Sequence, residues 1–204
     1  MMNKFTISEG LMDYYSKPDI AEAVDSLVDK LNGKNPPELS WEESQKYNRA
    51  LLMAAQVRAD YVDLLYRIWE ETFGAHDRLD DLRGEYFYSY GFSISEIWKD
   101  KWLERTYYRN GNPDEGGKND TLLVSTEGDK LSLQVWRYKD EDSPARPGRA
   151  NDAEGWKYVK KDGDNYFITE KHVSMKKFVE NPDEYIVEFR KAAKSMIDKL
   201  LEQP

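Results

Sequence analysis

The sequence predicts an α+β fold in which helices come first, an antiparallel meander of about five strands follows, and a helix closes the chain. Three observations support this fold class. An apolar stripe at helical spacing runs from Ser40 to Phe73. Strand-like segments separated by glycine-containing turns follow, and a capped amphipathic segment begins at Asn181. Strands grouped together between helices are typical of an α+β protein rather than of a repeated βαβ unit.

The composition indicates a chain that can bury a sizeable core. It has 204 residues, of which 39% are hydrophobic, and it includes 6 Trp, 14 Tyr and 7 Phe. Aromatic side chains bury large areas, so we expect an ordered domain rather than a disordered chain. We expect a helical region over 1–83 and an aromatic-rich antiparallel sheet with a C-terminal helix over 84–204. The two regions are expected to form one composite domain.

Cysteine content and charge exclude several classes of protein. The chain has no cysteine, which excludes disulfides, thiolate metal sites and cysteine nucleophiles. No segment resembles a secretion signal or approaches the roughly 18 apolar residues of a membrane span, so we expect a cytoplasmic protein without membrane contact. The net charge of −9 disfavours direct binding to nucleic acid. It suits either a solvated surface or a face that meets a basic partner.

Two helices are expected in the N-terminal region. The first covers Pro18 to Asn32, because proline is favoured in a first turn and glycine follows the last residue. The second begins at Ser40, where Glu43 completes a capping box. At about 1.5 Å per residue it is roughly 50 Å long, more than a small domain needs. We therefore expect part of it to project, to kink, or to pair with a second subunit through 41–73. Its apolar stripe comprises Tyr47, Leu51, Ala54, Ala55, Tyr61, Val62, Leu65, Ile68, Trp69 and Phe73.

The second half is expected to be mostly strand. A short helix is indicated by the spacing of Ile94, Ile97 and Trp98. Gly128 and Gly163 mark tight hairpins, because glycine accepts the positive φ of such turns. The final helix has Asn181 as its cap, Pro182 in its first turn, and acidic residues next to them. The expected strands are Leu103–Arg109, Thr121–Thr126, Lys130–Tyr138, Trp156–Lys161 and Asn165–His172.

Paired carboxylates are the pattern that most favours a catalytic alternative. Asp60 and Asp63 lie three residues apart, as do Asp77 and Asp80. Such pairs on neighbouring helices can bind Mg²⁺ through oxygen ligands. The pattern resembles the paired acidic motifs of helical nucleotide pyrophosphohydrolases, although those use Glu where this chain has Asp. A metal-dependent hydrolase is therefore an alternative function. Nearby arginines allow these aspartates to form surface ion pairs instead.

Other motifs are incomplete. The segment Asn110-x-Asn112-x-Asp114 imitates half of an EF-hand, but it lacks the glycine and the final glutamate that calcium binding requires. Gly116-Gly117-Lys118 lacks the strand and helix that frame a phosphate loop. The only two histidines, His76 and His172, do not complete a ligand set with their neighbours. We expect no catalytic residue, no cofactor and no metal.

Aromatic residues carry the main functional expectation. They are so dense from Tyr86 to Phe92 that one inward face cannot hold them all. Some must therefore reach the surface, where tyrosine and tryptophan are enriched among binding hot spots. The candidate anchors are Tyr86, Tyr88, Tyr90, Trp98, Trp136 and Trp156, and the candidate acidic rim is Asp140, Glu141 and Asp142.

We thus expect a non-enzymatic protein that binds another macromolecule. The acidic surface suits an inhibitor of a basic or nucleic-acid-handling protein, and in composition the chain is similar to bacterial toxin-immunity proteins and phage inhibitors of host defence. Acidic groups would steer the encounter, and aromatic anchors would slow dissociation. The other alternative is a self-assembling structural protein whose long helix pairs across a two-fold axis.

Overall fold

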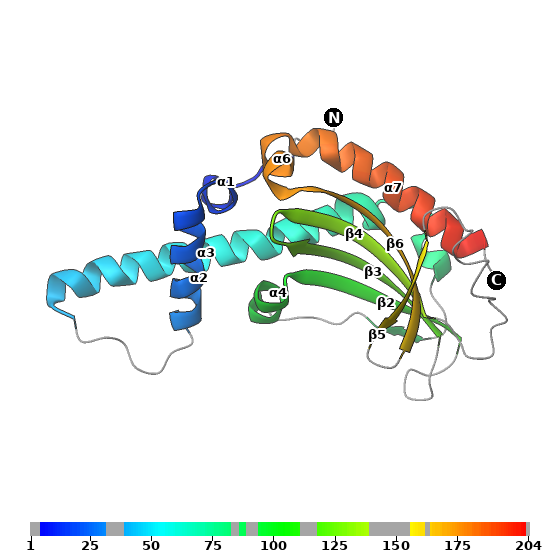
Figure 1. Cartoon of the computed structure of the whole chain (residues 1–204), viewed down its shortest axis with the longest axis horizontal. Coiled ribbons are helices and arrows are strands. Elements are labelled where there is room, and N and C mark those ends of the chain that lie inside the picture. Colours follow the sequence, from blue (N-terminus) through cyan, green and yellow to red (C-terminus); the bar gives the residue numbers. More distant parts are fainter. Residues whose placement is uncertain are drawn as a thin grey trace.

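One antiparallel sheet and two long helices form the body of the protein (Figure 1). The computed structural model describes residues 5–31, 39–82, 86–88, 94–110, 118–138, 156–161 and 164–202. The predicted α+β class is confirmed: helices precede the sheet and a helix follows it. None of the described helices combines the length and apolar character that crossing a membrane requires.

The helical elements agree closely with the predicted ones. Their bounds are α1 Glu9–Ser16, α2 Pro18–Leu31, α3 Trp41–Trp69, α4 Ile94–Asp100, α6 Met175–Glu180 and α7 Pro182–Glu202. A π-helical turn, η1 (Glu70–Gly74), extends α3, and a 3₁₀ turn, η2 (Leu79–Leu82), follows. The predicted capping box is present, because the Glu43 amide donates to Ser40 Oγ and the Glu43 carboxylate accepts from the Ser40 amide. The sequence did not predict α1.

The sheet has the order β1-β2-β3-β4-β6-β5, and every paired strand is antiparallel. Four long strands form its body: β2 Trp102–Asn110, β3 Lys118–Glu127, β4 Lys130–Tyr138 and β6 Asp164–Ser174. Short strands lie at the edges, β1 Tyr86–Tyr88 and β5 Lys157–Lys161. All five predicted strand segments coincide with observed strands, and β1 is additional.

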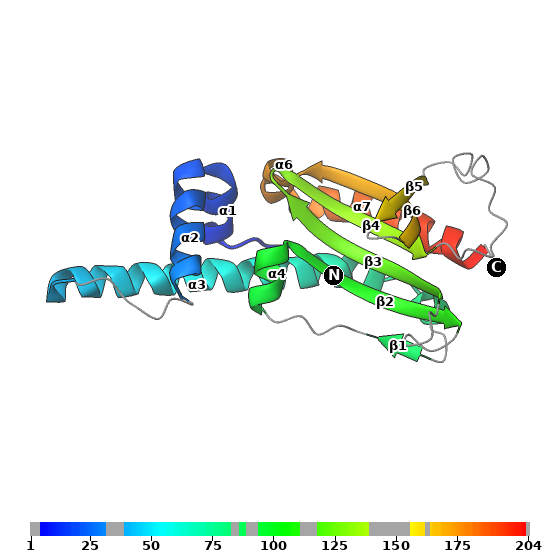
Figure 2. The same cartoon turned by 60° about the horizontal axis from the view of Figure 1, so that its bottom comes forward.

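The core lies between one face of the sheet and the helices α3 and α7. Figures 1 and 2 both show these helices along the same side of the sheet. Strand side chains at alternate positions point into this layer, as the two-residue period of a strand requires. Leu122 faces Val135 and Val124 faces Leu133 across β3 and β4, and all four are fully buried. The helices contribute large buried side chains: Trp69, Phe73, Phe178, Phe189 and Ile197.

Helix α3 extends far beyond this core. In Figures 1 and 2 its C-terminal half lies against the sheet, while its N-terminal half passes α2 and continues into solvent. Burial follows the same division. Of the predicted apolar stripe, the residues from Tyr61 onward are buried, whereas Tyr47, Leu51 and Ala55 are only partly covered. The expectation that part of this helix projects is confirmed.

The β3–β4 hairpin gives a first stability prediction. Gly128 lies in its two-residue turn with φ of +56°, and a Cβ added there would meet no atom within 4 Å. Backbone strain is thus the only penalty for Gly128→Ala, and we expect a loss of about 1–2 kcal/mol in the free energy of unfolding, measured by urea denaturation. Gly128→Asn should lose less, because asparagine tolerates this conformation. Equal losses for the two variants would contradict the explanation.

Candidate functional site

The structure places the predicted aromatic anchors in different environments. Trp98 on α4 is only 6% exposed and packs edge-on against Tyr61, so it belongs to the core of the chain. Trp156, before β5, is equally buried, and its Nε1 has no hydrogen-bond partner among the described residues. Trp136 on β4 is partly exposed and donates from Nε1 to Gln134 Oε1 at 2.8 Å. These three tryptophans do not form one surface.

The remaining predicted contacts lie outside the described side chains. Tyr86 and Tyr88 belong to the edge strand β1, and their side chains lie outside the described part of the chain. Tyr90, Asp140, Glu141 and Asp142 also lie outside the described residues. The acidic rim therefore remains a prediction from the sequence.

The paired carboxylates are not gathered into one cluster. The described residues contain no group of three or more acidic or histidine side chains placed to hold a metal ion. Asp60 accepts a hydrogen bond from Gln56 at 2.6 Å, and Asp63 lies 3.9 Å from Arg67 on the same helix. Asp77 is exposed and lies beside His76, and Asp80 is an exposed residue of η2. On α3, Asp60 is therefore engaged by an amide and Asp63 by an ion pair, and among the described residues the two do not form part of a metal site.

An exposed apolar stripe runs along α3 on the side away from the sheet. Trp41 is 81% exposed, Leu52 72% and Tyr66 38%. At about 100° per residue these three side chains lie within about 40° of one another around the helix. The small residues Ala55 and Ala59 lie between them on the same stripe. We call this surface, comprising Trp41, Leu52, Ala55, Ala59 and Tyr66, the free face of α3. Exposed apolar groups in such a row are typical of an interaction surface.

Charged residues flank the free face in a pattern that reverses sign along the helix. Two sets of three charged residues share the same spacing, four residues and then three, when one set is followed toward the C-terminus and the other toward the N-terminus. Corresponding residues of the two sets carry opposite charges. The first set is Glu42, Lys46 and Arg49, and the second set is Arg67, Asp63 and Asp60. All six lie on one flank of the helix. Within the chain, Lys46 pairs with Glu42 at 3.1 Å, and Arg67 also donates to the carbonyl of Thr6.

A second unusual feature lies at the junction of α4 and β2. Lys101 has φ of +62°, and no other described residue except a glycine has a positive φ. Its amide donates to the carbonyl of Ile97, and its carbonyl accepts from the Thr126 amide at 2.8 Å. Left-handed backbone costs a residue with a Cβ about 1–2 kcal/mol and is found preferentially at functional positions.

The Lys101 side chain ends in a cage of aromatic rings. Its Nζ lies 3.4 Å from the centre of the Trp98 ring, 5.0 Å from that of Tyr61 and 6.0 Å from that of Tyr14. The Nζ is buried and has no hydrogen-bond partner among the described residues. Burial lowers the pKa of Lys101 to about 8, although the Asp25 and Asp29 carboxylates act in the opposite direction. The ring faces replace part of the lost hydration by cation–π attraction.

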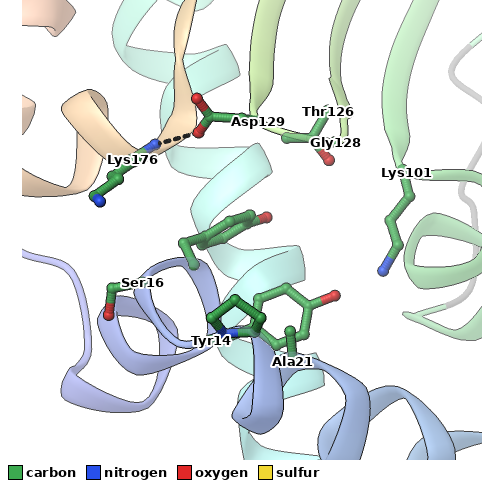
Figure 3. Close-up of a pocket in the computed structure, with 10 residues that line it drawn as sticks. Tyr14, Ser16, Ala21, Lys101, Thr126, Gly128, Asp129 and Lys176 are labelled. Atoms are coloured by element: carbon green, nitrogen blue, oxygen red, sulfur yellow. Dashed lines mark hydrogen bonds between the residues drawn. The ribbon is translucent and has the colours of Figure 1, made fainter.

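Lys101 lines a cavity of about 430 Å³ between the N-terminal helices and the end of the sheet (Figure 3). This volume lies within the range of about 300–1,000 Å³ that is typical of small-molecule sites. The wall is formed by the first two helices, the β3–β4 turn and the start of α6. The lining residues are Tyr14, Tyr15, Ser16, Pro18, Ala21, Lys101, Thr126, Gly128, Asp129 and Lys176.

The carboxylate in this wall already has partners. Asp129 accepts hydrogen bonds from Ser174 Oγ at 2.6 Å and from the Lys176 amide at 2.8 Å, the contact drawn in Figure 3. These hydrogen bonds lower the pKa of Asp129, which therefore stays ionised and holds the start of α6. Across the cavity, burial raises the pKa of Tyr14 and Tyr15, so both phenols are neutral at pH 7.

Sequence reasoning missed both the free face of α3 and the Lys101 site. Trp41 and Leu52 stand eleven residues apart, three helical turns, and this spacing was available as a signal. Lys101 carries no such signal, because only Trp98 of its cage is near it in the sequence, while Tyr14 of α1 and Tyr61 of α3 are distant. Comparison with protein-family models, with curated proteins and with solved structures finds no match for this chain.

Proposed function

We propose that this protein is an interaction protein whose binding surface is the free face of α3, and that this face pairs with the same face of a second copy. The observation that carries the proposal is the row of exposed side chains led by Trp41 and Leu52. On a helix that projects beyond the core, such apolar side chains are removed from water only when another molecule covers them.

The flanking charges support a second copy as the partner. When two α3 helices lie antiparallel, residues on one flank of the first helix meet residues on the same flank of the second. In one register Glu42 meets Arg67, Lys46 meets Asp63 and Arg49 meets Asp60, so every facing pair has opposite charge. Such complementarity fixes orientation and register. In this register the two-fold axis passes beside Ala55.

The same register makes the apolar groups complementary. Trp41 of one copy lies at the level of Tyr66 to Ile68 of the other, while Leu52 lies beside Ala55 and Ala59. Large side chains thus face small or flat ones, which allows two helices to approach closely. The overlap of the two helices is about 40 Å long at 1.5 Å per residue.

Cysteine cross-linking tests the register, because the chain has no cysteine of its own. Ala55→Cys should form a disulfide dimer rapidly under mild oxidation, since the two residues lie beside the axis and within disulfide reach. Gln45→Cys is the matched control: it is exposed on the same helix, but its symmetry mate lies about 30 Å away. A mixture of Lys46→Cys and Asp63→Cys chains should cross-link as heterodimers.

Light scattering across a concentration series provides the second measurement. The unaltered chain should dimerise, and Leu52→Glu should weaken association by about 30- to 100-fold, because it places like charges at the centre of the interface. A chain that remains monomeric at every concentration would refute the proposal. Equal cross-linking rates for Ala55→Cys and Gln45→Cys would also refute it.

A further inference from the structure

We infer that the cavity beside Lys101 is a binding site for a small organic anion, a carboxylate or phosphate on an apolar body, whose charge is met by the Lys101 ammonium. This site is separate from the free face of α3. It lies on the opposite side of that helix from Leu52, where α1, α4 and the β3–β4 turn meet.

The first step of the argument is charge. A buried ammonium normally has an anion or hydrogen-bond acceptors beside it, because removing it from water is costly. Lys101 Nζ has no hydrogen-bond partner among the described residues, and the ring of Trp98 lies 3.4 Å from it. An anion in the adjoining cavity would place the missing countercharge near this ammonium.

The second step is the backbone. Glycine is the usual residue in a left-handed position directly after a helix, yet this position after α4 holds a lysine. The strain is maintained by the hydrogen bonds from Lys101 to Ile97 and from Thr126 to Lys101. A side chain kept at such a position, ending unpaired beside a cavity, indicates a role for its charged group.

The third step is the set of charges around the cavity. Asp25 and Asp29 on α2 act on Lys101 from one side, but Asp25 also accepts a hydrogen bond from the Tyr14 hydroxyl at 3.0 Å. The Asp129 carboxylate is held by Ser174 and the Lys176 amide. Lys176 supplies a second cation at the opposite side of the cavity from Lys101, as Figure 3 shows.

The apolar part of the ligand follows from the remaining lining. The phenol rings of Tyr14 and Tyr15, with Pro18 and Ala21, present an apolar surface next to the charged group. Tyr14, Tyr15 and Tyr61 keep their protons, because burial raises the pKa of each, so they add no negative charge that would repel an anion. An aromatic or short aliphatic body suits this wall.

Phenyl phosphate and phenylacetate are the probes, and phenol is the neutral control. Titrations followed by the backbone amide signals of Thr126, Gly128 and Asp129 should show saturable shifts with one or both anions and none with phenol at concentrations up to about 10 mM. Lys101→Met should weaken binding at least tenfold. Lys99→Met, which removes an exposed lysine of α4, should leave binding unchanged.

A second variant separates loss of binding from loss of folding. Lys101→Gly fits a φ of +62° without strain and should fold at least as stably, yet it should also lose the anion. The affinity for phenyl phosphate should fall about fivefold between pH 8 and pH 9, because the free Lys101 ammonium loses its proton there while the phosphate charge stays constant. The inference would be overturned if Lys101→Met bound the anions as tightly as the unaltered chain does, or if phenol bound as tightly as the anions. It would also be overturned if neither anion gave a saturable shift.

Discussion

Replacing Arg137 by methionine is expected to lower the free energy of unfolding by about 3–5 kcal/mol. The Arg137 guanidinium donates to Asp120 from Nε at 2.9 Å and from Nη2 at 3.2 Å, and Nη2 also donates to the Leu200 carbonyl at 2.7 Å. Asp120 has no exposed surface. Without Arg137 its charge would stay buried without its main partner, and the end of α7 would lose its hydrogen bond to the sheet.

Urea denaturation at one fixed protein concentration measures this effect, since self-association would shift the apparent stability. Arg78→Met is the matched control, because Arg78 and its partner Asp81 are both about half exposed and such pairs contribute roughly 0–1 kcal/mol. The double variant Asp120→Leu with Arg137→Met should recover much of the loss, because it removes the unpaired charge. A loss for Arg137→Met no larger than that for Arg78→Met would contradict the explanation.

Trp69→Ala is expected to cost about 3–5 kcal/mol for a different reason, the cavity that it leaves in the core. Trp69 is 1% exposed, and its ring lies beneath the Arg105 guanidinium at 4.3 Å and beside Phe73. Its Nε1 donates to the Leu122 carbonyl of the central strand β3 at 3.2 Å. Trp69 therefore joins α3 to the sheet both by the packing of its ring and by a hydrogen bond.

Trp69→Phe separates these two contributions. Phenylalanine keeps most of the apolar volume but cannot donate to Leu122, so the loss should be smaller than for Trp69→Ala. Trp41→Ala is the control, measured at a concentration where the chain is monomeric, and it should change stability by less than about 0.5 kcal/mol because the ring is 81% exposed. If Trp41→Ala destabilised the monomer as much as Trp69→Ala, the division of α3 into a buried half and a projecting half would be wrong.

Local signals predicted most of the fold. Ser40 and Glu43 satisfy each other's backbone groups, so the start of α3 depends only on residues within one turn. Gly128 marks its hairpin because the turn needs a positive φ there. The short helix α1 was missed because its Ser8 cap, which accepts a hydrogen bond from the Leu11 amide, is followed by only eight helical residues with a single fully buried side chain.

The candidate sites were predicted far less well, because exposure depends on contacts between distant segments. Trp98 and Trp41 are the same residue type, yet Trp98 is covered by Tyr14 of α1 and Tyr61 of α3, while Trp41 is left exposed at the end of α3. The paired aspartates likewise show that spacing along one helix does not predict contacts between distant segments. Spacing places Asp60 beside Asp63 on one helix, but it does not determine whether a second pair approaches them.

The sequence by itself determined most of the helices and strands and the β3–β4 turn, because caps, hairpin residues and apolar periodicity act over a few neighbouring residues. The tertiary structure decided which apolar residues form the core, which face of α3 stays free, and that three aromatic rings surround Lys101. The physical reason is that burial, and with it the unpaired charge and lowered pKa of Lys101, arises only when α1, α3, α4 and the β3–β4 turn pack together.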